Sequence, residues 1–323
     1  MKLALKIDVD TYRGIDDGAS RLAAFLSSKH IPASFFVSLG PDNSGWAASR
    51  VFRHRGFLKK MQRTSALSVY GWRTVLSGTL LPARPMGTSF KERLRAFRTM
   101  GFEVSPHGFD HIGWHDRAAH WDEARAREEL EKTTRVYEAV FGELPQSFAA
   151  PGWQAGLGTW RAMEPMKLLY HSDSRGEGPY FPSFARRRDD SPGEGGFKTL
   201  EIPTTLPTWD EMLAWPATPA LAGPPGRSGG DGVTPENLVE RTLKEFKSDT
   251  INVWTVHAEF EGNVYFSHFK SLIERASAEG VEWQFLPDLA RHLLQAPGKI
   301  PVHGFIQGTR PGRAGTVTCE SYG

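Results

Sequence analysis

The sequence predicts an α/β fold, either a (β/α) barrel or a doubly wound parallel sheet, in a single domain. Short apolar runs alternate with amphipathic segments along most of the 323 residues, which favours parallel strands joined by crossover helices. Polar residues follow the ends of the apolar runs, as in a barrel whose catalytic face lies at the carboxyl ends of its strands. We find no internal repeat, so we expect one domain over 1–296.

The predicted strands are short apolar runs, several of them rich in β-branched or aromatic residues. LALKIDV opens the series, and INVWTVH, late in the chain, is the strongest of them. In chain order, we expect strands at 3–9, 33–39, 102–106, 147–151, 167–172, 199–204, 251–257 and 281–285.

The predicted helices lie between these strands and carry apolar residues at helical spacing. In the first of them, Leu22, Phe25 and Leu26 lie on one face. Helices are expected at 18–29, 89–100, 121–141, 235–247 and 265–279. Two segments rich in Pro and Gly, 215–235 and 297–323, predict a long surface loop and an irregular C-terminal tail.

The composition excludes several classes of protein. The chain is 39% hydrophobic with a net charge of +2, which suits a globular protein and argues against a polyanion binder. The single cysteine, Cys319, excludes a disulfide framework and a multi-thiolate metal site. The start, MKLALKIDVD, lacks the features of a signal peptide, and no run of eighteen apolar residues occurs. We therefore expect an intracellular protein with no transmembrane span.

One basic stretch, at about 43–91, has no acidic residue between Asp42 and Glu92. Its lysines and arginines are interleaved with aromatic residues and leucines, as in segments that bind anionic membrane surfaces. A basic helical insertion packed on the domain and a nucleic-acid patch are the alternatives. We favour an anionic membrane surface as the partner of residues 50–91 and expect no nucleic-acid partner.

The first predicted strand ends in two carboxylates, Asp8 and Asp10. Side chains alternate along a strand, so both point to one face. Two such charges are costly without a cation nearby, although solvated acids in a loop would also fit. HGFDH places His107 and His111 on one side of a helical turn, where both can reach one divalent ion. One Asp would complete the ligands, the other would act as general base, and His257 could serve as general acid.

Four blocks, IDVD, HGFDH, AAPGW and TVHAEFEG, resemble the motifs of the NodB-type polysaccharide deacetylases, carbohydrate esterase family 4. The resemblance implies a distorted (β/α) barrel with fewer than eight regular repeats. It also implies that Asp10, His107 and His111 bind one divalent metal ion, which Zn, Mn, Co or Fe would satisfy. It further implies Asp8 as the base and His257 as the acid.

This chain departs from the family pattern in the third motif. The family's usual Arg, which pairs with the base, corresponds here to Ala149. We expect Arg175, or else Arg13, to supply the positive charge beside Asp8.

Further blocks, including IDVDTYRG, GPDNSG, SALSVYGW, YHSDSRG and IPTTLPTWDE, resemble a deformylase branch of the family over roughly residues 3–290. This resemblance implies hydrolysis of the N-formyl group from 4-deoxy-4-formamido-L-arabinose linked through phosphate to undecaprenol. The product is the aminoarabinose lipid used for lipid A modification and polymyxin resistance. The branch implies a peripheral protein on the cytoplasmic face of the inner membrane.

Candidate substrate contacts follow several predicted strands: Trp153, Asp173, Arg175, Trp209 and Glu259. The two tryptophans are expected to form walls for the sugar, although each would also suit a core position. For Asp173 and Glu259, the alternative is a buried salt bridge with Arg175.

Three other functions stay open from the sequence. A deacetylase of an N-acetylated cell-wall sugar would share the metal residues, but it would be exported, and we see no export signal. A two-His, one-carboxylate iron oxygenase shares the ligand types, but the β/α alternation disfavours its usual all-β fold. A catalytically silent sugar-lipid binding protein is the third, although the presence of both Asp8 and His257 favours catalysis.

Overall fold

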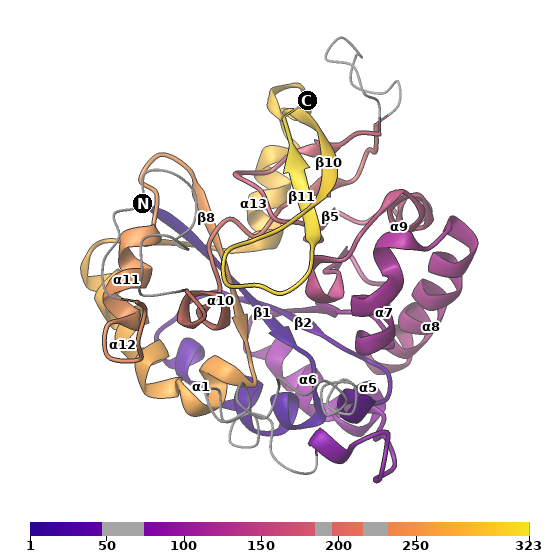
Figure 1. Cartoon of the computed structure of the whole chain (residues 1–323), viewed down its shortest axis with the longest axis horizontal. Coiled ribbons are helices and arrows are strands. Elements are labelled where there is room, and N and C mark those ends of the chain that lie inside the picture. Colours follow the sequence, from indigo (N-terminus) through magenta and orange to yellow (C-terminus); the bar gives the residue numbers. More distant parts are fainter. Residues whose placement is uncertain (47–73, 185–195, 216–231, 323) are drawn as a thin grey trace.

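The computed structural model describes residues 1–46, 74–184, 196–215 and 232–322. In this part of the structure, the strands lie at the centre and the helices lie around them (Figure 1). The α/β class predicted from the sequence is confirmed.

The largest sheet is parallel and runs in the order β3-β2-β1-β8, with β9 also paired to β1. Its strands are β1 (Lys2–Val9), β2 (Ser34–Val37), β3 (Glu103–Pro106), β8 (Ile251–His257) and β9 (Glu282–Gln284). β1 is buried from its second residue to its last, as expected for a parallel strand covered on both faces. Its register with β8 sets Asp8 directly beside His257.

A second parallel sheet continues the first, in the order β4-β5-β7. Its strands are β4 (Ser147–Phe148), β5 (Tyr170–His171) and β7 (Leu200–Glu201). The Ala149 amide donates to the Pro106 carbonyl (3.2 Å) beside β3, and the Thr205 amide donates to the Val253 carbonyl (3.1 Å) of β8. These isolated bonds bridge the places where the ladders break, which is consistent with a distorted barrel.

The helices pack around these strands, with α1, α11 and α12 on one side and α7, α8 and α9 on the other (Figure 1). Their bounds are α1 (Ser20–Ser28), α5 (Met86–Ser89), α6 (Lys91–Thr99), α7 (His111–Arg117), α8 (Glu123–Phe141), α9 (Leu157–Met163), α10 (Trp209–Leu213), α11 (Leu238–Glu245), α12 (Phe266–Ala278) and α13 (Leu286–Leu293). The sequence analysis did not predict α5, α7, α9, α10 or α13. The first four are short, whereas α13 carries Leu286, Leu289 and Leu293 at helical spacing and was overlooked.

Two π-helical turns, Gly14–Ala19 after β1 and Phe260–Val264 after β8, contact each other through glycines. A Cβ atom on Gly262 would lie 2.6 Å from the Gly18 Cα, and one on Gly18 would lie 1.9 Å from the Ala258 carbonyl oxygen. Because only glycine permits this approach, the segments that follow β1 and β8 lie against each other.

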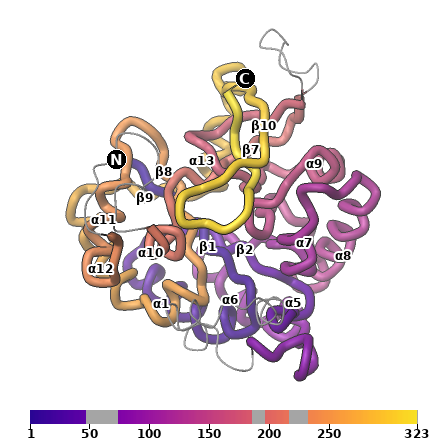
Figure 2. The backbone as a smooth tube through the Cα atoms, in the orientation of Figure 1, coloured from indigo at the N-terminus to yellow at the C-terminus, as the bar shows by residue number. Residues whose placement is uncertain are grey.

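The C-terminal residues form an antiparallel hairpin, so the expectation of an irregular tail at 297–323 was wrong. β10 (Val302–Gly308) pairs with β11 (Val317–Ser321) and, on its other edge, with β6 (Phe181–Pro182). Of the Gly and Pro residues that suggested irregularity, Pro311, Gly312 and Gly315 lie in the connecting loop, where Gly312 and Gly315 have φ of 79° and 80°. Figure 2 shows this loop, in yellow, passing in front of β1.

Two features of the sequence lie mainly outside the described residues. These are the basic stretch, of which 47–73 is not described, and the Pro- and Gly-rich loop, of which 216–231 is not described. The membrane role of residues 50–91 therefore stays a prediction. In the part of the chain that the structure describes, no helix is both long and apolar enough to cross a bilayer.

Candidate metal centre

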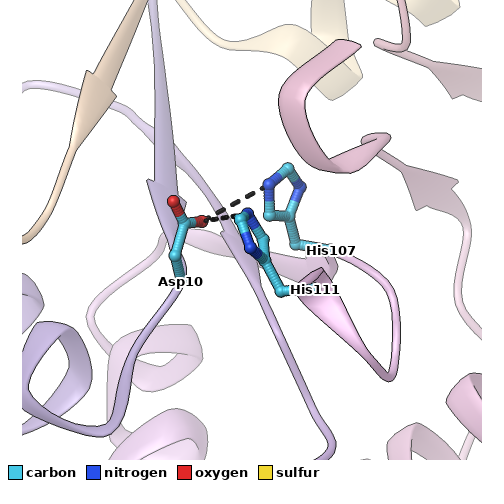
Figure 3. Close-up of side chains that lie close together, drawn as sticks. All are labelled: Asp10, His107 and His111. Atoms are coloured by element: carbon cyan, nitrogen blue, oxygen red, sulfur yellow. Dashed lines mark ion pairs between the residues drawn. The ribbon is translucent and has the colours of Figure 1, made fainter. Parts of the chain in front are cut away.

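Asp10, His107 and His111 lie together just beyond the carboxyl ends of β1 and β3 (Figure 3). The Asp10 Oδ1 atom is 3.4 Å from the Nε2 atom of His107 and 3.3 Å from the Nε2 atom of His111. One ligand atom from each residue lies within 4.8 Å of the others, so a single ion could contact all three. The residues that the sequence suggested as ligands are thus brought together.

The two histidines do not share a helical turn, as their spacing had suggested. His107 lies in the loop after β3, and His111 is the first residue of α7. Gly108 between them has a φ of 77°, which breaks any helix at this point. The Glu129 Oε1 atom accepts a hydrogen bond from the Asp110 amide (2.9 Å), so α8 fixes this loop.

The donor atoms at this site suit a divalent cation. The Asp10 Oδ1 atom is buried and has no hydrogen-bond partner. The His107 Nδ1 atom lies 2.7 Å from the Ala149 carbonyl oxygen, which can only accept, so Nδ1 carries the proton and Nε2 is free to bind a metal. Burial lowers the pKa of His107 well below its usual value and that of His111 to about 4, which keeps both rings neutral. Burial also raises the pKa of Asp10 to about 7, so this carboxylate gains from a cation.

The positive charge beside Asp8 belongs to Lys6, and not to Arg175 or Arg13 as we expected. The fully buried Lys6 Nζ atom lies 3.6 Å from the Asp8 Oδ2 atom and donates to the Ser172 carbonyl oxygen (3.0 Å). Arg175 instead binds Glu211 (2.7 Å), and Arg13 pairs with Asp17 (3.3 Å). Residues 6 and 8 share one face of β1, so the strand itself supplies the partner.

Glu259 binds the backbone of Asp10 and Thr11 and does not face a substrate. It is buried, and its Oε1 atom accepts hydrogen bonds from the amides of Asp10 (2.9 Å) and Thr11 (2.8 Å) and from the Thr11 hydroxyl (2.8 Å). It therefore fixes the backbone that carries Asp10, which corrects its assignment as a substrate contact.

His257 ends β8 and lies beside a carboxylate that the sequence analysis had not given a role. Its Nδ1 atom is 3.8 Å from the Asp210 Oδ1 atom, and its ring meets that of Trp153 edge to face at 6.2 Å. Burial alone would lower the pKa of His257, but Asp210, Asp10 and Glu261 outweigh it and raise the pKa to about 9. The imidazole is therefore a proton donor near neutral pH.

Asp173 is fully buried and holds the peptide that orients His107, so it is not placed to touch a substrate. Its Oδ1 atom accepts from the Ala150 amide (2.8 Å). The carbonyl of the same peptide unit, that of Ala149, accepts from His107 Nδ1 (2.7 Å). Asp173 thus acts on a candidate metal ligand through one peptide group.

The neighbouring cluster of His171, Asp173 and Glu201 also brings potential ligand atoms together. Its carboxylate oxygens, however, already accept hydrogen bonds, including those from Trp160 Nε1 to Asp173 and from the Ser174 amide to Glu201. We therefore interpret this cluster as a buried ion-pair network.

Replacing Asp173 by Ala is expected to weaken binding of Co²⁺ by about 10- to 100-fold, the range typical of partners that orient metal ligands. Asp173→Asn keeps an acceptor for the Ala150 amide and should recover part of this loss. Trp160→Phe is the control, because it removes the bond to the other Asp173 oxygen and leaves the Ala150 bond in place. Titration of the metal-free variants with Co²⁺ measures the effect, and equal affinity in wild type and Asp173→Ala would contradict it.

The remaining candidate contacts are buried. Trp209 is fully buried, packs on Trp254 (5.3 Å between ring centroids) and donates to the Thr242 hydroxyl (2.8 Å), so it is a core residue and not a sugar wall. Arg175 is held by Glu211 and lies over the Trp153 ring at 4.8 Å.

Trp153 is at the site but is only 2% exposed, with a left-handed φ of 53°. Such a backbone is strained in a residue other than Gly and occurs often at functional sites. Its indole Nε1 donates to the Thr204 hydroxyl (2.9 Å). The buried ring lies against the cationic groups of Lys6, Arg175 and Arg313, so it does not form an open wall for a sugar.

Three residues near the site, Lys6, Asp210 and Arg313, were not predicted from the sequence. Lys6 could have been found from the alternation of β1, and Asp210 from its position after a predicted strand. Arg313, from the C-terminal hairpin, lies over the Trp153 ring at 4.6 Å and donates to the Gly152 carbonyl oxygen (3.3 Å). No sequence signal that we used pointed to Arg313.

Comparison with known proteins places the chain in a family. The model of the family described as polysaccharide deacetylase matches residues 8–169. Over 90% of this chain and 86% of the relative, the chain is 31% identical to a probable 4-deoxy-4-formamido-L-arabinose-phosphoundecaprenol deformylase of Shewanella sediminis. It is 26% identical to the protein described in the same words from Wigglesworthia glossinidia brevipalpis, over 94% of this chain and 96% of that relative.

The fold is also similar to that of a crystal structure from Mycobacterium smegmatis, described as a presumed polysaccharide deacetylase. The TM-score is 0.58 at 19% identity, over 96% of this chain and 94% of the other. The matched family region contains Asp8, Asp10, His107 and His111. The chain belongs to the polysaccharide deacetylase family, whose members are hydrolases that act on N-acyl groups.

Proposed function

We propose that this protein is a divalent-metal-dependent amide hydrolase that removes the N-formyl group from 4-deoxy-4-formamido-L-arabinose linked to undecaprenyl phosphate. The product would be the aminoarabinose lipid used for lipid A modification and polymyxin resistance. The observation that carries the proposal is the cluster of Asp10, His107 and His111 with Asp8 and His257 beside it. The two deformylase relatives support this choice of substrate.

In this proposal, Asp10, His107 and His111 would hold a divalent cation, which would supply Lewis-acid chemistry to the hydrolysis. Asp8 takes the proton from the water as it attacks the carbonyl carbon. The Lys6 ammonium, 3.6 Å from the Asp8 Oδ2 atom, holds the Asp8 carboxylate in place. His257 gives its proton to the departing sugar amine, which leaves formate and the free amine as products.

Asp210 sets the alkaline limit of this reaction. His257 must be protonated to act as the acid, so activity falls as the pH rises through its pKa of about 9. Replacing Asp210 by Asn removes a negative neighbour and lowers that pKa, which should move the alkaline limb to lower pH by about one unit. The pH dependence of kcat/KM measures this shift. An alkaline limb that stays in place in Asp210→Asn would contradict the role.

Two alternatives share most of these residues. A deacetylase of another N-acylated sugar would use the same centre, and a catalytically silent sugar-lipid binding protein would not turn substrate over. The location that goes with our proposal is peripheral, on the cytoplasmic face of the inner membrane, with residues 50–91 against anionic lipid. Failure to bind anionic liposomes at low salt would contradict that location.

The proposal is tested by incubating the metal-loaded protein with the formamido- and acetamido-arabinose lipids. We expect release of formate from the first at a rate well above release of acetate from the second. Preference for the acetamido lipid would favour the deacetylase. Binding of both lipids without release of either acid would favour the silent binding protein.

A further inference from the structure

The loop of the C-terminal hairpin, residues 309–316, is fixed against the rim of the candidate metal centre. The Trp215 Nε1 atom donates to the Pro311 carbonyl oxygen (3.3 Å), and the Gln154 side-chain Nε2 atom donates to the Thr316 carbonyl oxygen (2.6 Å). Arg313 donates to the Gly152 carbonyl oxygen (3.3 Å). The loop is therefore tied to the protein at several points, in front of β1 (Figure 2).

Beneath this loop lies a cavity of about 260 Å³, which we call the anion cavity. Its lining includes the polar side chains of His115, Asp116, His120, Gln154 and Arg313, and Ala119 and residues 314–316 complete the wall. Three of these five side chains can carry a positive charge or donate from an imidazole. The one acid, Asp116, makes a hydrogen bond with the His115 Nδ1 atom at 3.3 Å.

The anion cavity adjoins the metal centre through α7. His115 follows His111 by one helical turn, and their rings stack with centroids 6.3 Å apart. Residues at this spacing lie about 5–6 Å apart on a helix surface, comparable to the width of one sugar ring. A sugar with its acylamino group at the metal centre can thus reach the anion cavity with a substituent on the opposite side of the ring.

Arg313 brings a charge that the protein only partly neutralises. Its Nη1 atom is 3.9 Å from Glu211 Oε1, but that oxygen already accepts from Arg175 Nη1 at 2.7 Å. Two guanidinium groups thus share one carboxylate oxygen, and the Arg313 side chain is only 14% exposed. Burial lowers the pKa of Arg313, and the carboxylates of Asp210 and Glu211 offset this only in part. An anion in the cavity would complete the pairing.

We propose that the anion cavity binds the phosphate group of an acylated sugar phosphate, with Arg313 as the charged ligand and His120 as a further donor. This inference rests on the proposed function, since it assigns a site to the phosphate of that substrate. The phosphate could belong to a polyprenyl phosphodiester or to a free sugar phosphate, which share this chemistry.

Kinetics with charged and neutral substrates test the proposal. The metal-loaded protein is assayed for formate release from 4-formamido-4-deoxy-L-arabinose 1-phosphate and from the neutral methyl glycoside of the same sugar. We expect Arg313→Gln to raise the KM for the phosphate about 10- to 100-fold, the range of a lost hydrogen bond to a charged group. The KM for the methyl glycoside should change far less than that for the phosphate, and a change in kcat through the charge near Asp210 should be the same for both substrates. Arg313→Lys should restore part of the loss.

Two variants make the result specific to the cavity. Arg310→Gln removes the same charge from the same loop, outside the cavity lining, and should leave the KM for the phosphate unchanged. His120→Gln changes an exposed lining residue and should raise it. The proposal is overturned if Arg313→Gln behaves like Arg310→Gln, or if Arg313→Gln raises the KM for the methyl glycoside equally.

A binding measurement separates this inference from the proposed function. If neither sugar releases formate, the deformylase function fails, and titration with methyl phosphate, followed by NMR of the histidine side chains, still tests the cavity. We expect binding that weakens at least tenfold in Arg313→Gln and His120→Gln. Equal affinity in all variants would mean that the phosphate binds elsewhere and would overturn the proposal.

A third substrate, a short polyprenyl phosphodiester of the formamido sugar, distinguishes a lipid-linked phosphate from a free sugar phosphate. A lower KM than that of the 1-phosphate, lost in Arg313→Gln, supports the cavity and assigns it to a lipid-linked substrate. Equal KM values, both raised in Arg313→Gln, support the cavity and assign it to the phosphate alone.

Discussion

Replacing Asp8 by Asn is expected to lower kcat by about 10²- to 10⁴-fold, the usual contribution of a positioned general base. The amide keeps the size of the carboxylate but cannot take a proton from water. Because Asp8 is not among the three clustered ligands, metal binding should persist. Single-turnover assays on the metal-loaded variant, with the metal content measured on the same sample, check both parts.

The control for this variant concerns the buried charge of Lys6. Asp8→Asn leaves the Lys6 ammonium, which is fully buried, without its partner at 3.6 Å. An unpaired buried charge costs about 3–5 kcal/mol of unfolding free energy. The double variant Lys6→Met, Asp8→Asn removes both charges and should regain stability without regaining turnover. Near-normal turnover in either variant would show that Asp8 is not the base.

Replacing His107 by Ala is expected to abolish stoichiometric metal binding and, with it, turnover. His107 is one of the three side chains of the candidate metal centre, and it is buried with its Nδ1 atom fixed by the Ala149 carbonyl oxygen. Its loss should weaken metal affinity more than the 10- to 100-fold expected for residues that merely orient a ligand. Metal titration monitored by calorimetry measures the change.

His268→Ala serves as the matched control, because it removes a surface imidazole on α12, away from the cluster. Its metal affinity and turnover should equal those of wild type. If His107→Ala still bound one metal ion with full activity, the metal centre would lie elsewhere in the chain.

The sequence could predict the residues whose position follows from local pattern. Asp8 and Asp10 share a strand face by alternation, and His107 and His111 follow a strand end, where barrels gather polar side chains. The order of strands and helices was readable for the same reason: apolar runs and helical spacing are local signals. The two His, however, span a loop and a helix start, which only the backbone conformation at Gly108 reveals.

Burial and long-range contacts account for the residues that were misjudged. Trp209 and Asp173 follow strand ends, yet the chain turns them into the core, where Thr242 and the Ala150 amide bind them. We expected an arginine distant in the sequence to be the positively charged partner of Asp8, although Lys6 is only two residues away on the same strand. Arg313 reaches the site only because β10 pairs with β6, a contact between residues more than a hundred positions apart.

The most direct test of the central claim is to titrate the metal-free protein with Co²⁺ while following formate release from the formamido-arabinose lipid. We predict that activity is absent without metal and rises linearly to a break at one equivalent. His107→Ala should show no such break. Full activity in the metal-free protein, or an unchanged titration in His107→Ala, would contradict a one-ion centre built from Asp10, His107 and His111.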